Sequence, residues 1–284
     1  MDLTAQTIFF SIPVLAVLGL CIGSFLNVVI HRLPMMLERG WKLESAEMLG
    51  LTTDVPPEIS LSKPRSRCPS CSHAITWSEN IPVFSYLRLG GRCSACKTRI
   101  SPRYPLFEIG TALLFAAVGW RFGAHPETLL WCAFVATLIA LAGIDWDTTL
   151  LPDSMTLPLL WAGVIAAIFG WTKLNLETAV WGAVVGYLSL WSVYWLFKLT
   201  TGKEGMGHGD FKLLAALGAW LGWQMVLPIV LAASVMGAVV GIAMKMSSTL
   251  REGRYVPFGP FLAGAAIVVL LAGSDRVLGW LGWV

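Results

Sequence analysis

Charged residues are scarce in this sequence. Only 13% of its 284 residues are Asp, Glu, Lys or Arg, whereas 56% are hydrophobic and the mean hydropathy is +0.70. A typical soluble domain carries about 25% charged residues, so this composition argues against a soluble protein. It predicts an all-α polytopic membrane protein, for which no nucleic-acid partner is expected.

The N-terminal segment lacks the basic residues of a cleavable secretory signal. Asp2 is the only charged residue before the first apolar run, whereas a signal peptide begins with a positively charged region. We therefore expect the first segment to remain as a transmembrane helix. Internal repeats and low-complexity tracts are also absent from the sequence.

Eight apolar runs have a length suited to crossing a membrane. They fall near residues 8–30, 105–123, 128–144, 156–171, 178–198, 211–227, 228–246 and 258–273. The sequence therefore predicts about eight transmembrane helices. We divide the chain into a first transmembrane helix (1–30), a loop with four cysteines (31–104) and a seven-helix membrane domain (105–284).

Basic residues predict the orientation of these helices. All of the twenty Lys and Arg residues except Arg121, Lys173 and Arg276 would lie on one face of an eight-helix arrangement. Loops rich in Lys and Arg remain in the cytoplasm. We therefore assign this face to the cytoplasm and place both termini on the other side.

The polar segment 31–104 contains two Cys-x-x-Cys pairs. Cys68 and Cys71 form the first pair, and Cys93 and Cys96 form the second. Four thiolates in two such turns suit tetrahedral zinc, and a complete set of four suits a structural rather than a catalytic ion. The alternatives are two disulfides or free thiols, and His73 could replace one ligand. Disulfides are disfavoured because the cytoplasm is reducing.

Two acidic residues lie at the ends of apolar segments. Asp145 directly follows an apolar stretch, and Asp210 follows the glycines at 205, 207 and 209. Carboxylates at a membrane edge are costly, which makes them functional candidates. Asp147 is the alternative to Asp145, and Asp153 is expected to cap the next helix. Asp210 could itself be a helix N-cap, a role compatible with catalysis.

Two carboxylates within hydrogen-bond reach do not both ionise easily, so the pair shares a proton near neutral pH. One can then activate water while the other protonates a carbonyl oxygen. If Asp145 and Asp210 meet, the sequence predicts aspartic-protease chemistry at the membrane edge. A proton-coupled transporter and a non-catalytic assembly protein are the alternative functions.

Several motifs, taken together and in order, resemble the type IV prepilin peptidase family. They are Gly23–Pro34, the two Cys-x-x-Cys pairs, Arg103–Leu106 with Glu108, Ile144-Asp145 leading to Leu151-Pro152-Asp153, Gly207–Lys212 and Pro257–Pro260. The resemblance covers nearly the whole chain. It is strongest to the form found in Gram-negative pilus biogenesis and type II secretion, which carries the cysteine module.

The resemblance implies an intramembrane aspartyl protease of the GxGD type, with Asp145 and Asp210 as its catalytic residues. Such enzymes cleave the basic leader peptide from type IV prepilins and type II secretion pseudopilins, after a glycine, at the cytoplasmic face of the bacterial inner membrane. Members of this form also N-methylate the new N-terminal residue with S-adenosylmethionine. The family associates methyl transfer with the cysteine-containing region, which makes Gly91 and Glu79 candidate donor-binding residues. Prepilins, pseudopilins and membrane lipids are the expected partners.

Overall fold

The computed structural model describes residues 10–51, 57–203, 205–247 and 256–283. Within these ranges the chain is helical, and its extended pairing is limited to two isolated bridges, Arg67 with Ala74 and Arg92 with Arg99. The all-α prediction is therefore confirmed. The chain divides into two compact units, Met1–Ala136 and Thr137–Val284.

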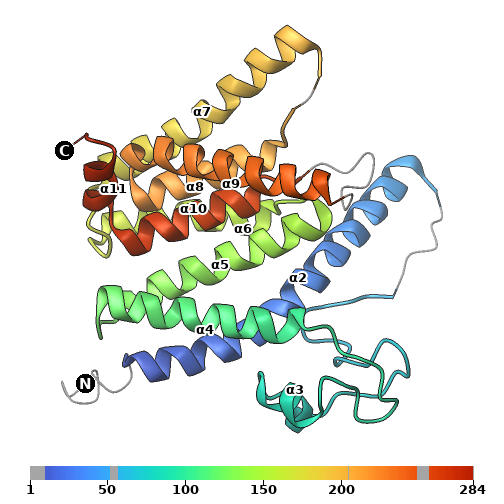
Figure 1. Ribbon diagram of the computed structural model, residues 1–284. Helices are drawn as coiled ribbons and strands as arrows, with labels where there is room; N and C mark the ends of the chain where they lie inside the picture. The colour runs from blue at the N-terminus through green and yellow to red at the C-terminus, as the bar shows by residue number, and fades with distance from the viewer. Residues whose placement is uncertain (1–9, 52–56, 204, 248–255, 284) are drawn as a thin grey trace. The chain divides into compact units, whose positions relative to one another are not determined.

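The first unit is built on two long helices. Its elements are α2 (Ile12–Leu49), the 3-10 helix η1 (Trp77–Glu79), α3 (Phe84–Arg88), α4 (Arg103–Phe122) and the beginning of α5 (Glu127–Thr148). The N-terminal half of α2 runs beside α4 (Figure 1). A side chain at Gly19 or Gly23 of α2 would lie only 2.6 or 2.7 Å from a Cα atom of α4. These two glycines therefore form the close-packing face that small residues provide between membrane helices.

Helix α2 is longer than the sequence analysis expected. The apolar run ends near residue 30, and the sequence predicted a loop from residue 31 to residue 104. The helix instead continues through Pro34 to Leu49 and ends at Gly50, which has a φ of +61°. Residues 35–49 are rich in Leu, Met and Glu, which are good helix formers, so the helix continues past the apolar run.

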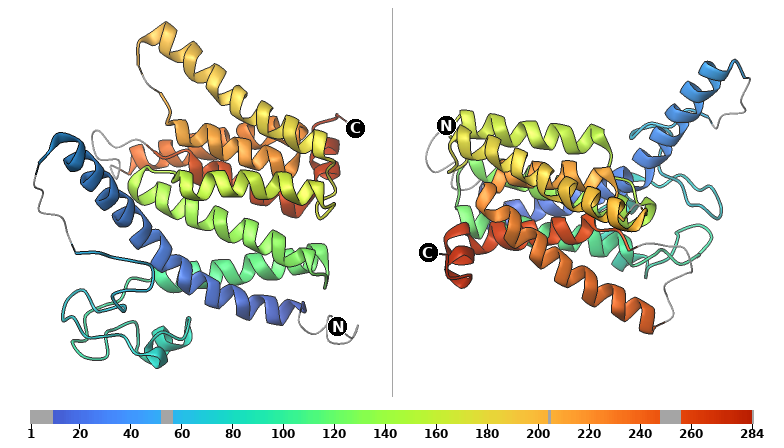
Figure 2. Two further views of the ribbon diagram at one scale, coloured as in Figure 1. Left: turned by 180° about the vertical axis from the view of Figure 1, so that it is seen from behind. Right: turned by 90° about the horizontal axis from the view of Figure 1, so that it is seen from above.

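The second unit surrounds one short, buried helix. Its elements are the end of α5, α6 (Asp153–Ile168), α7 (Leu176–Thr201), α8 (His208–Leu221), the 3-10 helix η2 (Trp223–Met225), α9 (Val226–Met246), α10 (Gly259–Ala272) and α11 (Ser274–Trp280). Every residue of α8 from Leu213 to Leu221 is buried. Helix α8 packs against α6, α7 and α10 (Figure 2). It is therefore the core of this unit, and it fixes the position of Asp210 near its N-terminus.

Helices α7 and α8 pack closely at positions where glycine leaves room for the neighbouring backbone. A side chain at Gly186 of α7 would lie 2.5 Å from the carbonyl oxygen of Leu214, and Gly182 faces Gly218 with no room for a Cβ on either residue. Gly182 and Gly186 are four residues apart, so they lie on one face of α7. This face brings the two backbones into direct contact.

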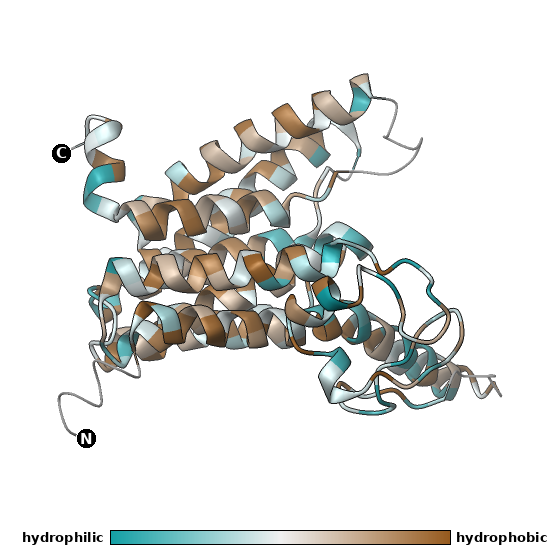
Figure 3. Ribbon diagram, turned by 60° about the horizontal axis from the view of Figure 1, so that its bottom comes forward, coloured by the Kyte–Doolittle hydropathy of each residue, from teal (hydrophilic) through white to brown (hydrophobic). Residues whose placement is uncertain are grey.

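The structure supports a multi-pass membrane protein. Among the described residues, five helical segments are long and apolar enough to cross a membrane: α2, α4, α5, α7 and residues 223–246. The pair α10 and α11, bent by 101°, would make a sixth. Figure 3 shows hydrophobic residues along the helices and hydrophilic residues in the cysteine-bearing segment.

Where the structure describes them, the eight expected apolar runs lie on helices, but three of these helices are short. Helices α6, α8 and α10 have 16, 14 and 14 residues, whereas a membrane span needs about 20. Eight spans therefore remain a prediction. The division of the chain into domains at residues 30 and 104 also remains a prediction. The boundary between the two compact units lies elsewhere in the sequence, after Ala136.

Candidate active site and metal centre

Asp145 lies in the last turn of α5 and is almost completely buried, with 5% of its surface exposed. Its Oδ2 atom accepts a hydrogen bond of 3.0 Å from the backbone N–H of Gly259, the first residue of α10. A side chain at Gly259 would lie 2.5 Å from that oxygen. Only glycine at this position lets the α10 backbone reach the carboxylate.

Asp210 is the third residue of α8 and is also buried, with 7% of its surface exposed. Its backbone N–H donates to the carbonyl oxygen of Gly207, which is the N-cap residue. Asp210 is therefore not the N-cap itself. Among the described residues, its side-chain Oδ1 atom has no hydrogen-bond partner. A buried polar atom without a partner is rare in proteins, and this one suits a site that binds water or a substrate group.

The structure brings the two acidic residues together. The side chain of Leu151 packs against Gly209, the neighbour of Asp210, and also against Gly259, the partner of Asp145. The C-terminal end of α5 therefore meets the N-terminal ends of α8 and α10, all within the second unit.

Asp153 binds a lysine instead of capping a helix, so this expectation was wrong. Both of its carboxylate oxygens lie 2.7 Å from the Nζ atom of Lys212. The N-cap of α6 is Pro152, and Asp153 is already the first helical residue. The preceding proline places Asp153 inside the helix, where its side chain reaches α8.

Asp147, the alternative to Asp145, is half-buried two residues further along α5. Gly259 donates its hydrogen bond to Asp145. The geometry therefore favours Asp145 as the partner of Asp210, although the catalytic role of either residue remains a prediction.

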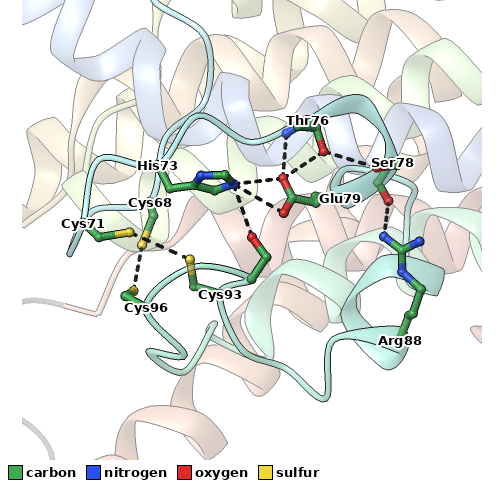
Figure 4. A network of polar contacts seen from close by, with 10 residues as sticks. Cys68, Cys71, His73, Thr76, Ser78, Glu79, Arg88, Cys93 and Cys96 are labelled. Atoms are coloured by element: carbon green, nitrogen blue, oxygen red, sulfur yellow. Dashed lines mark hydrogen bonds and ion pairs between the residues drawn. The ribbon is translucent and has the colours of Figure 1, made fainter.

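The four cysteines form one cluster, whose sulfur atoms all lie within 4.8 Å of one another (Figure 4). No disulfide joins them. The Cys68 and Cys96 sulfurs are 3.7 Å apart, and the Cys71 and Cys93 sulfurs are 4.0 Å apart. Four thiols at these separations fit one tetrahedral metal ion.

Each pair of cysteines lies in a backbone turn, and the two turns have the same geometry. The N–H of Cys68 donates to the carbonyl oxygen of His73, and that of Cys93 donates in the same way to Thr98, both at 2.9 Å. Ser72 and Lys97 follow the two pairs with φ angles of +58° and +60°. Segments 67–74 and 92–99 are thus two copies of one turn, which face each other across the sulfur cluster.

Hydrogen bonds favour the thiolate forms of Cys68 and Cys96, whereas contacts with the neighbouring cysteines raise the pKa of Cys71 to about 12. The Thr98 hydroxyl, together with its backbone, lowers the pKa of Cys96 to about 6. The backbone at Cys71 lowers the pKa of Cys68. Since a thiolate is the form that binds metal, these contacts prepare the cluster for an ion.

His73 and Glu79 lie beside the cluster (Figure 4). The His73 Nε2 atom is 3.2 Å from Glu79 Oε2 and 3.2 Å from Ser94 Oγ, so His73 is not needed as a fourth ligand. Glu79 also accepts hydrogen bonds from the backbone and hydroxyl of Thr76. Ser94 and Thr76 lower the pKa of Glu79 to about 2. Glu79 therefore joins η1 to the second cysteine turn as a structural anion.

Gly91 lies elsewhere in the module, at the wall of a cavity. Its N–H donates to the carbonyl oxygen of Tyr86, and its own carbonyl oxygen accepts from the N–H of Ile100. A side chain at Gly91 would meet the Tyr86 hydroxyl at 2.9 Å. The cavity, of about 510 Å³, is lined by Gly91 but not by Glu79. The two candidate donor-binding residues therefore do not share this cavity.

Sequence reasoning missed two contacts in these sites. It identified the segment Pro257–Pro260 only as a motif, whereas Gly259 donates a hydrogen bond to a buried carboxylate. It also assigned no role to Glu108, which is buried in α4 and accepts a hydrogen bond of 2.7 Å from the N–H of Val83. A glycine between two prolines and an acid within an apolar helix were the available signals.

The fold and site define a class of protein, a multi-pass membrane protein with a buried pair of carboxylates and a four-cysteine module. The comparisons identify its family. Residues 17–122 match the bacterial peptidase A24 N-terminal domain, and residues 132–242 match the type IV leader peptidase family. The chain belongs to the type IV leader peptidase family.

Three related proteins are each named prepilin leader peptidase/N-methyltransferase. The Pseudomonas putida protein is 54% identical over 93% of this chain and 91% of its own length. The Pseudomonas aeruginosa protein is 52% identical over 91% of this chain and 89% of its own length. The Aeromonas hydrophila protein is 51% identical over 92% of this chain and 90% of its own length. No solved structure matches the chain.

Proposed function

We propose that this chain is a bifunctional membrane enzyme that processes prepilins. It cleaves the basic leader peptide from type IV prepilins and type II secretion pseudopilins after a glycine. It then N-methylates the new N-terminal residue with S-adenosylmethionine. The names of relatives with at least 50% identity support both activities.

The buried pair Asp145 and Asp210 carries the proposal for peptide cleavage. The N–H of Gly259 stabilises negative charge on Asp145, so we assign Asp145 as the base that takes a proton from water. Asp210 lacks such a donor at Oδ1, so we assign its protonated form as the acid. The catalytic machinery would then be complete without a metal ion at these carboxylates.

The proposed reaction follows from these two roles. The water oxygen attacks the carbonyl carbon of the glycine while Asp145 takes a water proton and Asp210 protonates the carbonyl oxygen. The C–N bond then breaks, its electron pair remains on nitrogen, and that nitrogen takes a proton from Asp145. Asp210 takes back the proton of the former carbonyl oxygen as the C=O bond reforms, so both carboxyl groups return to their starting states. The products are the leader with a new carboxyl group and the pilin with a free N-terminal amine.

The second activity uses that amine. Its nitrogen lone pair forms a bond to the donor methyl carbon, and the C–S bond electrons move to sulfur, which changes from a sulfonium to a thioether. The resulting ammonium can release a proton to water. We assign this step to the cysteine-containing module.

We propose zinc as the metal of the cysteine cluster, held by Cys68, Cys71, Cys93 and Cys96. All four sulfurs would be ligands, so the ion would stabilise the module rather than bind substrate. The cysteine separations and the lowered pKa values of Cys68 and Cys96 support this assignment.

We place the chain in the bacterial inner membrane, with both sites at the cytoplasmic face. The distribution of Lys and Arg supports this orientation. The basic leader of a prepilin would then remain on the side where the carboxylate pair lies. Its apolar helix would stay in the membrane.

The test is to incubate the purified full chain in detergent with a prepilin and S-adenosylmethionine, and to analyse the products by mass spectrometry. We expect a product that begins one residue after a glycine and is heavier by one methyl group. An uncut prepilin would indicate an assembly protein instead. Proton flux in vesicles containing the chain, without cleavage, would indicate a transporter.

A further inference from the structure

The described part of the cysteine module between α2 and α4, residues 57–102, exposes several large apolar side chains. Trp77 of η1 is 83% exposed, and Phe84 and Leu87 of α3 are 59% and 70% exposed. We call these three residues the apolar patch. Apolar side chains that gather on an exposed surface mark a site that binds a partner or a membrane. Neither proposed reaction assigns a role to this patch.

Contacts within the module hold η1 and α3 together, so the patch is one surface. The two elements pack against each other, and the Arg88 guanidinium of α3 donates a hydrogen bond of 3.1 Å to the carbonyl oxygen of Ser78 in η1 (Figure 4). Phe84 and Leu87 are three residues apart and therefore share a face of α3. Ser85, on the other side of the helix, is buried. The module thus presents the patch outward.

A contact with α4 places the patch at the level of the membrane boundary. Helix α4 is long and apolar enough to cross a membrane, and its 20 residues extend about 30 Å, which just matches the hydrocarbon core. The N–H of Val83, directly before α3, donates to Glu108 at 2.7 Å (Figure 1). Glu108 follows Arg103, the first residue of α4, by about 8 Å along the helix. The turn that leads into α3 therefore lies beside the α4 span and not beyond its end.

This depth indicates that lipid covers the patch. The polar headgroup layer is about 5–8 Å thick on each side of the hydrocarbon core, so α3 lies where headgroups meet acyl chains. Tryptophan and other large apolar side chains are favoured at this boundary. A partner protein in water would instead need a patch that lies clear of the bilayer.

The charge of the module favours an anionic bilayer. Residues 57–102 contain seven Lys and Arg residues, but only two Glu residues and no Asp. Arg92 and Arg99 lie near α3, since both line the cavity that Tyr86 of α3 also lines. Among the described residues, neither of these arginines has a carboxylate partner. Basic residues beside exposed apolar side chains are the combination that binds a protein surface to anionic lipids.

We infer that the cysteine module docks on the bilayer that α4 crosses, with the apolar patch between the headgroups and with Arg92 and Arg99 beside the phosphates of anionic lipids. This inference goes beyond the proposed function, because neither cleavage nor methyl transfer requires it. If the proposed function holds, docking also keeps the module at the membrane edge, where cleavage leaves the new amine.

The first test places a fluorescent amino acid at Leu87, and separately at Phe84, in the full chain. Each protein is reconstituted at one chain per nanodisc of phosphatidylcholine and phosphatidylglycerol. We expect strong quenching by a lipid with a nitroxide near the headgroup, and protection from iodide in the water. The control is the same label at Met48, which is 87% exposed and lies at the end of α2, well beyond the apolar run. Iodide should quench this label several-fold more than the lipid nitroxide does.

The second test removes positive charge. Each basic residue near an anionic surface strengthens binding by about fivefold. The double variant Arg92→Gln with Arg99→Gln should therefore lower the ratio of quenched to unquenched Leu87 label by about 25-fold in discs with phosphatidylglycerol. Discs of phosphatidylcholine alone should show little change. Lys173→Gln is the control, because Lys173 lies in the second unit between α6 and α7.

The two quenchers distinguish the ways in which the inference can fail. A Leu87 label that iodide reaches and the lipid nitroxide does not would place the patch in water and overturn the inference. Protection from both quenchers would mean that protein covers the patch, which also overturns it. An unchanged ratio in the double variant would rule out the arginines as lipid contacts. None of these measurements requires cleavage or methyl transfer, so their outcome is independent of the proposed function.

Discussion

At the residue scale, the absence of a side chain at Gly259 allows the backbone of α10 to contact the carboxylate of Asp145. Gly259 donates its N–H to Asp145, and a Cβ atom at this position would lie 2.5 Å from the accepting oxygen. The contact is with a buried charged group at the end of a packed helix. The carboxylate and the α10 backbone therefore cannot both keep their positions when Gly259 is substituted.

We expect Gly259→Ala to reduce prepilin cleavage by about 100-fold, because displacing a catalytic group by about 1 Å has an effect of that size. Cleavage rates of the purified protein measure the effect. Gly264→Ala is the control on the same helix, since a side chain there would meet only a methionine methyl group at 4.0 Å. Equal rates for both variants would show that Gly259 does not position Asp145.

Glu108 is a second residue whose contact can be tested. Its carboxylate accepts the N–H of Val83, and Val83 has a φ of +57° and a ψ of −48°. The N–H of Phe84 donates to the carbonyl oxygen of Pro82, so Val83 is the centre of a γ-turn of the strained hand. A β-branched residue rarely adopts this conformation. The hydrogen bond that the Val83 N–H donates to Glu108 holds the turn that precedes α3.

Glu108→Ala should therefore destabilise α3 locally. A buried N–H left without an acceptor costs about 1–3 kcal/mol, and the Val83 N–H is partly buried, so the lower end of this range should appear as faster amide hydrogen exchange at Phe84–Arg88. Glu108→Gln keeps an acceptor oxygen and should show a smaller increase. If the alanine variant exchanges at the wild-type rate, the hydrogen bond does not hold the turn.

The sequence predicted which residue types matter, but not these contacts. The two Cys-x-x-Cys pairs and the two acids were identified because their chemistry is unusual in such an apolar chain. The partner of Asp145 lies 114 residues away in sequence. No local pattern indicates that pairing, since it depends on how α5 and α10 pack.

At the scale of elements, glycine pairs determine how closely the helices of each unit pack. Gly19 and Gly23 let α2 approach α4 closely, and Gly182 and Gly186 do the same for α7 and α8. The α7 pair is adjacent to many other small residues, so its sequence alone does not show which face meets α8. The length of α2 was also underestimated, since helix propensity continues it beyond the apolar residues.

Gly186→Ala should separate α7 from α8. The added methyl group would lie 2.5 Å from a backbone oxygen, and overpacking of this kind costs about 1–3 kcal/mol. The measurement is the thermal unfolding midpoint in detergent. Gly110→Ala in α4 is the control, because a side chain there meets nothing within 4 Å. A Gly186→Ala midpoint no lower than that of the control would contradict the close packing.

The cysteine module makes a prediction about metal content. Cys93→Ser removes one of four sulfurs from the cluster, so we expect zinc bound by the purified protein to fall from stoichiometric to near zero. Mass spectrometry of metals measures this directly. Cys21→Ser is the control, since Cys21 lies on α2 and outside the cluster. Full zinc content in the Cys93→Ser protein would rule out the four-cysteine site.

At the scale of the whole molecule, the chain combines a set of membrane helices with one polar module. The membrane class followed from composition, because 56% of the residues are hydrophobic and only 13% are charged, against about 25% charged in a typical soluble domain. The helical architecture followed from apolar runs of spanning length. The number of membrane-spanning helices could not be predicted from the sequence in the same way. An apolar run as short as α8 looks the same in the sequence whether it crosses a membrane or forms the centre of a helix bundle.

The two proposed activities use different residues, so a single substitution should be able to abolish one activity and leave the other unchanged. Asp145 and Asp210 belong to the second unit, and the cysteine module belongs to the first. A substitution that removes only a carboxylate charge should therefore leave methyl transfer to a pre-cleaved peptide intact. Asn replaces Asp with almost the same shape, so each unit should remain folded.

The most direct measurement is the cleavage rate of Asp145→Asn and Asp210→Asn, with Asp147→Asn as the control and methyl transfer to a pre-cleaved peptide recorded in parallel. We predict that both variants lose cleavage by about 10⁴-fold or more, as expected when a member of a catalytic unit is removed. Methyl transfer should continue, and the control should still cleave. Full cleavage by either the Asp145→Asn or the Asp210→Asn protein would contradict the account.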